Sequence, residues 1–128
     1  MEFSTPHHIA LICHDRTKAL HFYRDILGFT LTAEHVRPEK KDVLLTLRKA
    51  ELVLELFIKP DAPARVSGST GEACGLRHLA FKTADVEQAK RYLEAQNVKC
   101  EAVRVDDHNG KKMLFFFDPD DLPLELHE

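Results

Sequence analysis

The stretch HHIALICHD, residues 7–15, begins the first apolar run of the chain, and a close counterpart, RHLAFKTAD, occupies residues 77–85. Each stretch reads as a histidine, a short apolar run and an aspartate where a helix could begin. A shift of seventy residues aligns the two stretches without a gap and places His8 on His78. A repeat has to be recognised before a fold is assigned, because each copy is one structural unit. The sequence therefore predicts two copies of one module.

The same offset of seventy reaches the far end of both halves. It aligns Leu44 with Leu114 and, within LVLELF, Glu55 with Glu125. The leucines around the two glutamates also match: Leu52, Leu54 and Leu56 with Leu122, Leu124 and Leu126. One match alone carries little weight, but a single offset that aligns His with His and Glu with Glu is hard to assign to chance.

Each half reads as a strand, a helix and three more strands. The expected strands cover residues 7–13, 30–36, 42–48 and 51–59, then 77–83, 98–105, 111–117 and 122–127. Asp15 and Asp85 are expected as helix N-caps, with Gly28 and Asn97 as helix ends. The predicted fold is α+β, with two tandem βαβββ modules in a single domain of residues 1–128. The modules span about 5–58 and about 76–128, and a Pro-, Gly- and Ser-rich linker spans about 59–75.

Strand parity gives the repeated residues a common place. Successive side chains point to opposite faces of a strand, so Glu55 lies opposite Leu54 and Leu56. By the same rule His8 lies opposite Ile9 and Leu11. We expect the helices to cover the wholly apolar faces on the outside. The other faces, with one His and one Glu per half, are then expected to form a curved sheet around a cavity.

Composition excludes several classes of protein. A hydrophobic content of 44% with 30% charged residues is typical of a folded soluble domain. The formal charge of −3 gives no basic footprint for nucleic acid, and no apolar run is long enough to cross a membrane. Three widely spaced cysteines suit a reducing compartment, and the first residues lack the pattern of a signal peptide. A cytoplasmic location is expected.

The repeated polar residues have the chemistry of a metal site. Neutral imidazole suits Zn, Ni, Co and Fe, and two carboxylates balance the charge of a divalent ion. A single strand histidine is usually hydrogen-bonded within the fold, and a single glutamate amid leucines usually faces water. The duplication favours the metal interpretation, with His8, Glu55, His78 and Glu125 as candidate ligands.

In these stretches the sequence resembles the vicinal oxygen chelate superfamily and, within it, glyoxalase I. The resemblance spans nearly the whole chain and includes ALHFYRDILGF, GLRHLAF and the ending DPDDLPLELHE. It implies paired βαβββ modules that form a cup, with a metal bound by His8, Glu55, His78 and Glu125. His7 adjoins the match, but the spacing to IALIC favours His8. Relatives that use two His and one carboxylate, such as extradiol dioxygenases, fit less well.

The resemblance implies a metal-dependent lyase or isomerase that acts through an enediolate on a hemithioacetal or another small molecule with vicinal oxygens. Methylglyoxal detoxification would be its setting. Glu125 is predicted as the principal base and Glu55 as the second candidate. The metal is predicted to be Zn, Ni or Co, with Mn or Fe as alternatives. Parity also predicts Phe57, Met113 and Phe115 at the pocket wall, and the charged loop HNGKKM suggests Lys111 near an anionic substrate.

Two positions depart from glyoxalase I. Ile12 stands where an arginine usually contacts glutathione, and Lys59 stands where bacterial enzymes often have asparagine. Glutathione or another thiol as co-substrate is therefore an open question. The alternatives are an epimerase, a dioxygenase, a thiol transferase, or a non-catalytic binding or resistance protein. By resemblance a homodimer is expected, with the site formed either within one chain or across two.

Overall fold

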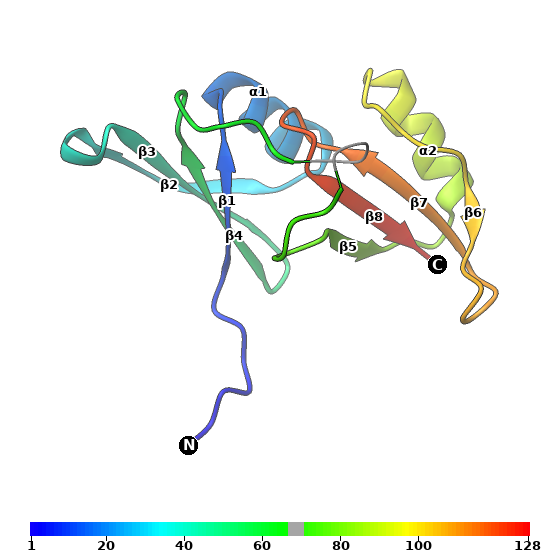
Figure 1. Cartoon of the computed structure of the whole chain (residues 1–128). Coiled ribbons are helices and arrows are strands. Elements are labelled where there is room, and N and C mark those ends of the chain that lie inside the picture. The colour runs from blue at the N-terminus through cyan, green and yellow to red at the C-terminus, as the bar shows by residue number, and fades with distance from the viewer. Residues whose placement is uncertain (67–70) are drawn as a thin grey trace. The chain divides into compact units, whose positions relative to one another are not determined.

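The computed structural model describes residues 1–66 and 71–128 (Figure 1). The chain divides into two compact units, Met1–Pro63 and Ala64–Glu128, called here the first and second modules. Their boundary falls in the segment predicted as a linker, whose residues 67–70 lie outside the described part. The finer module and linker bounds remain predictions.

The first module contains one βαβββ unit. Its order is β1 (Ile9–Cys13), α1 (Arg16–Leu20), the π-helical η1 (His21–Ile26), β2 (Thr30–Arg37), the 3-10 turn η2 (Pro38–Lys40), β3 (Asp42–Lys49) and β4 (Leu52–Ile58). Its four strands form one open sheet in the order β1-β4-β3-β2. β1 runs parallel to β4, and the other pairs are antiparallel.

The second module repeats that order. It contains β5 (Leu79–Lys82), α2 (Val86–Ala95), β6 (Arg104–Val105), β7 (Lys112–Phe117) and β8 (Pro123–His127). Its sheet has the order β5-β8-β7-β6, with β5 parallel to β8. The predicted α+β class with two βαβββ modules is confirmed. Each sheet is open and is not curled on itself, so the expected cup remains a prediction.

Helix ends follow the local chemistry of the sequence. Asp15 accepts a hydrogen bond of 2.8 Å from the backbone N–H of Lys18, and Asp85 accepts one of 2.9 Å from that of Gln88. These carboxylates satisfy amides that have no partner inside the helix. Gly28 has a φ of +80°. The left-handed conformation, easy for glycine, turns the chain away from the helix as predicted.

The first helix departs from a regular α-helix after Leu20. The N–H of Leu27 bonds to the carbonyl of Phe22 at 2.9 Å, which is an i to i−5 bond. This wider turn leaves the apolar residues Phe22, Tyr23 and Ile26 buried. An apolar spacing of three and four residues fits either kind of turn, so the sequence did not distinguish them.

Burial alternates along β1, β4 and β7 as parity predicted. Leu54 and Leu56 are fully buried, whereas Glu55 between them is half-buried. The helices lie on the buried faces. In the first module, Arg16 of α1 is hydrogen-bonded to Glu34, which lies across from buried Leu45 and so on the same face of the sheet. In the second module, Glu87 of α2 contacts Lys112, which shares a face of β7 with buried Leu114. In each module the face that carries the repeated glutamate therefore lies opposite to the helix.

Two sequence expectations about the second module were wrong. The strand expected over 98–105 is reduced to a bridge between Cys100 and Phe116 and the short β6. The pairing shifts by one residue between Cys100–Phe116 and Arg104–Met113, as in a β-bulge, and this breaks the ladder. The expected match of Leu44 with Leu114 is also displaced by one residue.

Cross-strand pairing explains the second error. Leu114 pairs with Leu126, whereas Leu56, the counterpart of Leu126, pairs with Leu45. Leu45 is therefore the equivalent of Leu114, because three residues separate Asp118 from Leu122, to which it is hydrogen-bonded, whereas two separate the corresponding pair, Lys49 and Leu52. Across the described residues, no helix is long and apolar enough to cross a membrane.

Candidate metal and substrate site

His8 and Glu55 lie side by side on the sheet face of the first module that is opposite to the helix, called here the open face. His8 directly precedes β1, and the parallel register pairs Ala10 with Glu55 on β4. The Nε2 atom of His8 is 3.3 Å from the Oε2 atom of Glu55. The Nδ1 atom of His8 lies 2.8 Å from the Nδ1 atom of His7, which therefore contacts the far side of the same ring. Of the two adjacent histidines, His8 is thus the one beside the glutamate.

His78 and Glu125 form the same pair in the second module. His78 directly precedes β5, and Ala80 pairs with Glu125 on β8. The Nε2 atom of His78 is 2.9 Å from the Oε2 atom of Glu125. The rings of Phe115 and His78 pack edge to face, nearly perpendicular, with 5.1 Å between their centroids. The seventy-residue offset therefore corresponds to one strand register that brings His and Glu together twice.

The two pairs differ in their exposure to solvent. The side chains of His8 and Glu55 are 37% and 24% exposed. Those of His78 and Glu125 are 25% and 9% exposed. Part of the difference has a clear source, because Phe115 is cross-strand from Glu125, whereas the smaller Thr46 is cross-strand from Glu55. Of the two repeated glutamates, Glu125 in the second module is therefore the less exposed to solvent.

The residues predicted for the pocket wall lie on these same open faces. Phe57 follows Glu55 by two positions on β4, and Met113 and Phe115 lie on β7 across from His127 and Glu125. All three side chains are half-buried, and Lys111 is exposed. Ile12 is also on this face of the first module, opposite Phe57 in the parallel register. These positions agree with the predicted parity, while contact with a substrate remains a prediction.

An ionic cluster around the buried carboxylate of Asp42 in the first module was not anticipated from the sequence. The Oδ1 and Oδ2 atoms of Asp42 accept hydrogen bonds from Nε and Nη2 of Arg37 at 2.7 and 2.6 Å. Nζ of Lys59 donates to Oδ2 of the same carboxylate at 2.6 Å. The guanidinium of Arg37 also stacks over the ring of Phe57, with its carbon 4.9 Å from the centroid. The cluster ties β2, β3 and the end of β4 together.

This cluster has a strong electrostatic effect on its acid. Hydrogen bonds from Arg37 first, and from Lys59 second, hold the pKa of the Asp42 carboxyl far below its ordinary value. The pKa of Arg37 is raised, chiefly by its hydrogen bonds to Asp42 and to a smaller extent by the charge of Glu55. Glu55 therefore lies within electrostatic reach of the cluster.

The Asp42→Asn variant is expected to be less stable than the wild type at pH 7, with a thermal midpoint lower by roughly 5 °C. Because the pKa of Asp42 is lower in the folded state than in the unfolded state, where it is about 4, the ionised carboxylate stabilises the folded protein above about pH 4. This stabilisation is lost as the pH falls from about 4 toward the pKa of the folded state. The difference between the two proteins should therefore shrink below about pH 4 in thermal melts. Glu34→Gln, which breaks the exposed pair with Arg16, is the control. A gap that stays constant from pH 7 to pH 3 would contradict this role of the ionised carboxylate.

A different pair occupies the corresponding end of the second module. Nε2 of His127 lies 3.0 Å from Oδ2 of Asp106, and Nδ1 lies 2.8 Å from the carbonyl oxygen of Glu128. The hydrogen bond to Asp106, and then that to Glu128, raises the pKa of His127. These contacts orient the ring toward Asp106. The two modules thus share the His–Glu pair but differ in the ionic groups beside it.

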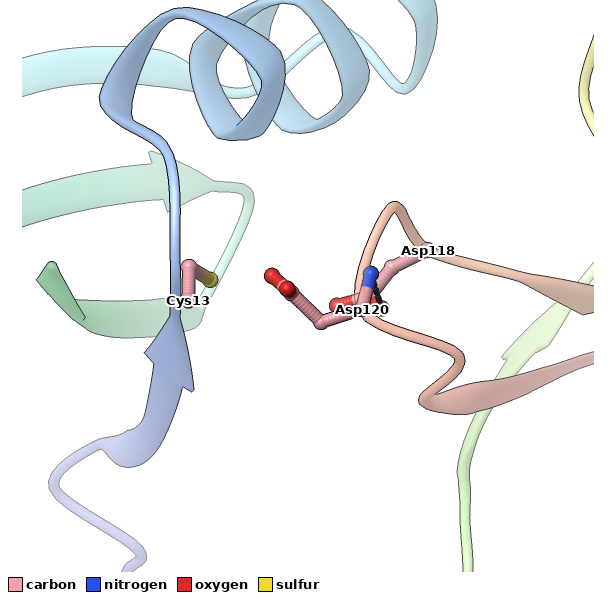
Figure 2. Close-up of side chains that lie close together, drawn as sticks. All are labelled: Cys13, Asp118 and Asp120. Atoms are coloured by element: carbon pink, nitrogen blue, oxygen red, sulfur yellow. Dashed lines mark hydrogen bonds between the residues drawn. The ribbon is translucent and has the colours of Figure 1, made fainter. Parts of the chain in front are cut away.

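The turn between β7 and β8 contains acidic residues, one of which stabilises the turn through hydrogen bonds to its backbone. Asp118 and Asp120 lie in this turn (Figure 2). Oδ1 of Asp118 accepts hydrogen bonds from the backbone N–H groups of Asp120 and Leu122 at 2.8 and 2.9 Å. Asp121 has a φ of +64°, the left-handed conformation that glycine adopts most easily. The carboxylate of Asp118 therefore stabilises the turn that leads into the strand of Glu125.

Comparison with known proteins places the chain in a family. The sequence profile of the Glyoxalase/Bleomycin resistance protein/Dioxygenase superfamily matches residues 5–126. The chain belongs to this superfamily. The crystal structure of a glyoxalase family protein from Enterococcus faecalis superposes with a TM-score of 0.93, 48% identity and full coverage of both chains. The predicted resemblance is therefore confirmed at the level of the superfamily.

Of two relatives of this chain, one has a name that states an enzymatic activity and the other does not. YaeR of Escherichia coli (strain K12), named as uncharacterized, is 49% identical over 126 residues, covering 95% of this chain and 94% of its own. Lactoylglutathione lyase of Schizosaccharomyces pombe (strain 972 / ATCC 24843) is 28% identical, covering 93% of this chain and 45% of its own. The superfamily includes such enzymes, and its members commonly bind divalent metals and act on small molecules. The relative that is more similar in sequence carries no named activity.

Proposed function

We propose that this protein is a metal-dependent lyase or isomerase of the glyoxalase I type. It would move a proton between adjacent carbons of a small molecule that carries vicinal oxygens. The observation that supports this best is the duplicated contact between His Nε2 and Glu Oε2, at 3.3 Å in one module and 2.9 Å in the other. The relationship to lactoylglutathione lyase supports the same reaction class.

The spacing within each pair fits two ligands of one metal ion. Two donor atoms that each lie about 2.1 Å from an ion, at right angles, are about 3.0 Å apart. Both observed contacts lie near this value. The proposed ligands are His8, Glu55, His78 and Glu125, a set suited to Zn, Ni or Co, with Mn or Fe as alternatives. The proposal requires both pairs to bind one ion, either within a chain or across a homodimer.

Each side chain has a separate task in this reaction. A divalent ion would supply Lewis-acid stabilisation of negative charge on the substrate oxygens. Glu125 is the proposed base, which takes the proton from one carbon and returns it to the next. Phe115 and the ring of His78 keep water from this carboxylate, so the proton is retained between the two transfers. Glu55 is the second candidate for the same role.

The thiol carried by the substrate is the open part of the proposal. A hemithioacetal of methylglyoxal and glutathione is the first candidate, because a relative is named lactoylglutathione lyase. Ile12 is 57% exposed on the open face, and Lys59 is bound to Asp42. Neither is the residue, arginine or asparagine, that glyoxalase I usually has at that position. Another thiol, or a substrate without one, would suit these two residues better. A cytoplasmic site of action is proposed.

The test reconstitutes metal-free protein separately with Ni²⁺, Co²⁺, Zn²⁺ and Mn²⁺. Isomerisation of the hemithioacetal and metal content are measured in the same samples. Activity that follows the bound metal is the expected result. Stoichiometric metal without activity would retain the metal centre and reject glutathione as the thiol. Protein that binds none of the four ions would overturn the proposal.

A further inference from the structure

The cluster of Arg37, Asp42 and Lys59 presents positive charge on the open face of the first module. The Asp42 side chain has no exposed surface, whereas those of Arg37 and Lys59 are 21% and 36% exposed. Two cations thus surround one acid, and only the cations face solvent. The chain as a whole has a formal charge of −3, so this local excess is not a general property of its surface.

The guanidinium of Arg37 is held in one orientation. Its Nε and Nη2 atoms are bound to Asp42, and its central carbon lies over the ring of Phe57. Among the described residues these bonds leave Nη1 for a ligand. A guanidinium whose position is already fixed loses less side-chain entropy when it binds an anion, because the ordering has been achieved in the fold.

The cluster lies near the end of β4, the strand that carries Glu55. Phe57 and Lys59 are two and four positions beyond Glu55, which is about 7 Å and about 13 Å at the usual rise of a strand. The alternation of side chains puts residues 55, 57 and 59 on one face. A small molecule bound near Glu55 could therefore extend along β4 to the cations.

We propose that Arg37, positioned by Asp42 and Phe57 and assisted by Lys59, binds an anionic group of the substrate. The substrate class is then a small carboxylate or phosphate compound whose vicinal oxygens lie at the other end. This inference rests on the proposed function, because it places the vicinal oxygens at the metal ligands. The second module has an acid and a histidine, Asp106 and His127, at the corresponding end, so the anionic group is assigned to the first module.

The experiment compares two hydroxamic acids, which chelate metals through adjacent oxygens. Succinic monohydroxamic acid carries a carboxylate, whereas butanohydroxamic acid has the same number of carbons and is neutral at that end. Calorimetry measures both affinities on the full chain loaded with Zn²⁺. The wild type should bind the carboxylate compound about tenfold more tightly, since hydrogen bonds to charged groups have about that effect.

The variants assign that preference to the cluster. Arg37→Gln should abolish the preference and leave the affinity for butanohydroxamic acid unchanged, and Lys59→Gln should reduce it. Arg16→Gln is the matched control, because Arg16 forms a similar bidentate pair with Glu34 on the helix side of the same sheet. It should keep the full preference.

The outcomes separate this inference from the proposed function. Equal binding of the two compounds by the wild type, or a preference that survives in both cluster variants, would overturn the anion site alone. Binding of neither compound to the zinc-loaded protein would remove the chelating site and the present inference with it.

Discussion

Glu125→Gln is expected to lower turnover by about 10²- to 10⁴-fold while the fold remains intact, the range that loss of a general base usually produces. The amide keeps an oxygen that can contact the proposed metal, but it cannot take the proton that the proposed base accepts. The isosteric change leaves the packing around the buried side chain nearly the same. Turnover of a metal-loaded sample, with metal content and thermal midpoint measured beside it, checks the result.

Glu55→Gln is the matched control, because the two glutamates occupy the same register in the two modules. Its loss of turnover should be smaller, since Glu55 is 24% exposed whereas Glu125 is 9% exposed and lies beside Phe115. A larger loss for Glu55→Gln would exchange the two roles. Turnover that is unchanged in both variants would reject a metal-site glutamate as the base.

The sequence predicted the parts of the fold that depend on local pattern. Aspartate N-caps, a glycine helix end and the alternation around Glu55 follow from the chemistry of neighbouring residues, and each is present in the structure. The repeat did more, because a shared offset for His and Glu implies a shared strand pairing. His8 and Glu55 are far apart in the sequence, yet their contact follows from the repeat together with strand parity.

Features that depend on the exact length of a hairpin turn or on a bulge could not be predicted. The one-residue difference between the two inner hairpins displaced Leu44 from Leu114, and a bulge shortened the strand expected over 98–105. The cluster around Asp42 was missed for the same reason. RPEKKD reads as a charged turn, and nothing local indicates that Arg37 is paired directly with Asp42 or that Lys59 bonds the same carboxylate.

His78→Ala is expected to weaken metal binding by more than about 100-fold, because even the loss of a residue that only orients a ligand costs about 10- to 100-fold. The metal retained after dialysis, and the rise in thermal midpoint on adding Zn²⁺, both measure the loss. A ligand that binds only the native state stabilises it according to its affinity, so the rise should nearly disappear. His108→Ala, in an exposed loop, is the control and should behave as the wild type.

His8→Ala then shows whether the two modules share one ion. If each histidine variant alone removes nearly all of the metal, both pairs bind the same ion, as proposed. If each variant instead retains one tightly bound ion where the wild type retains two, each His–Glu pair is a separate two-residue site. The repeat accounts for either result, since it explains only why the pairs are alike. The number of ions per chain therefore decides whether the duplicated register has become a single metal centre.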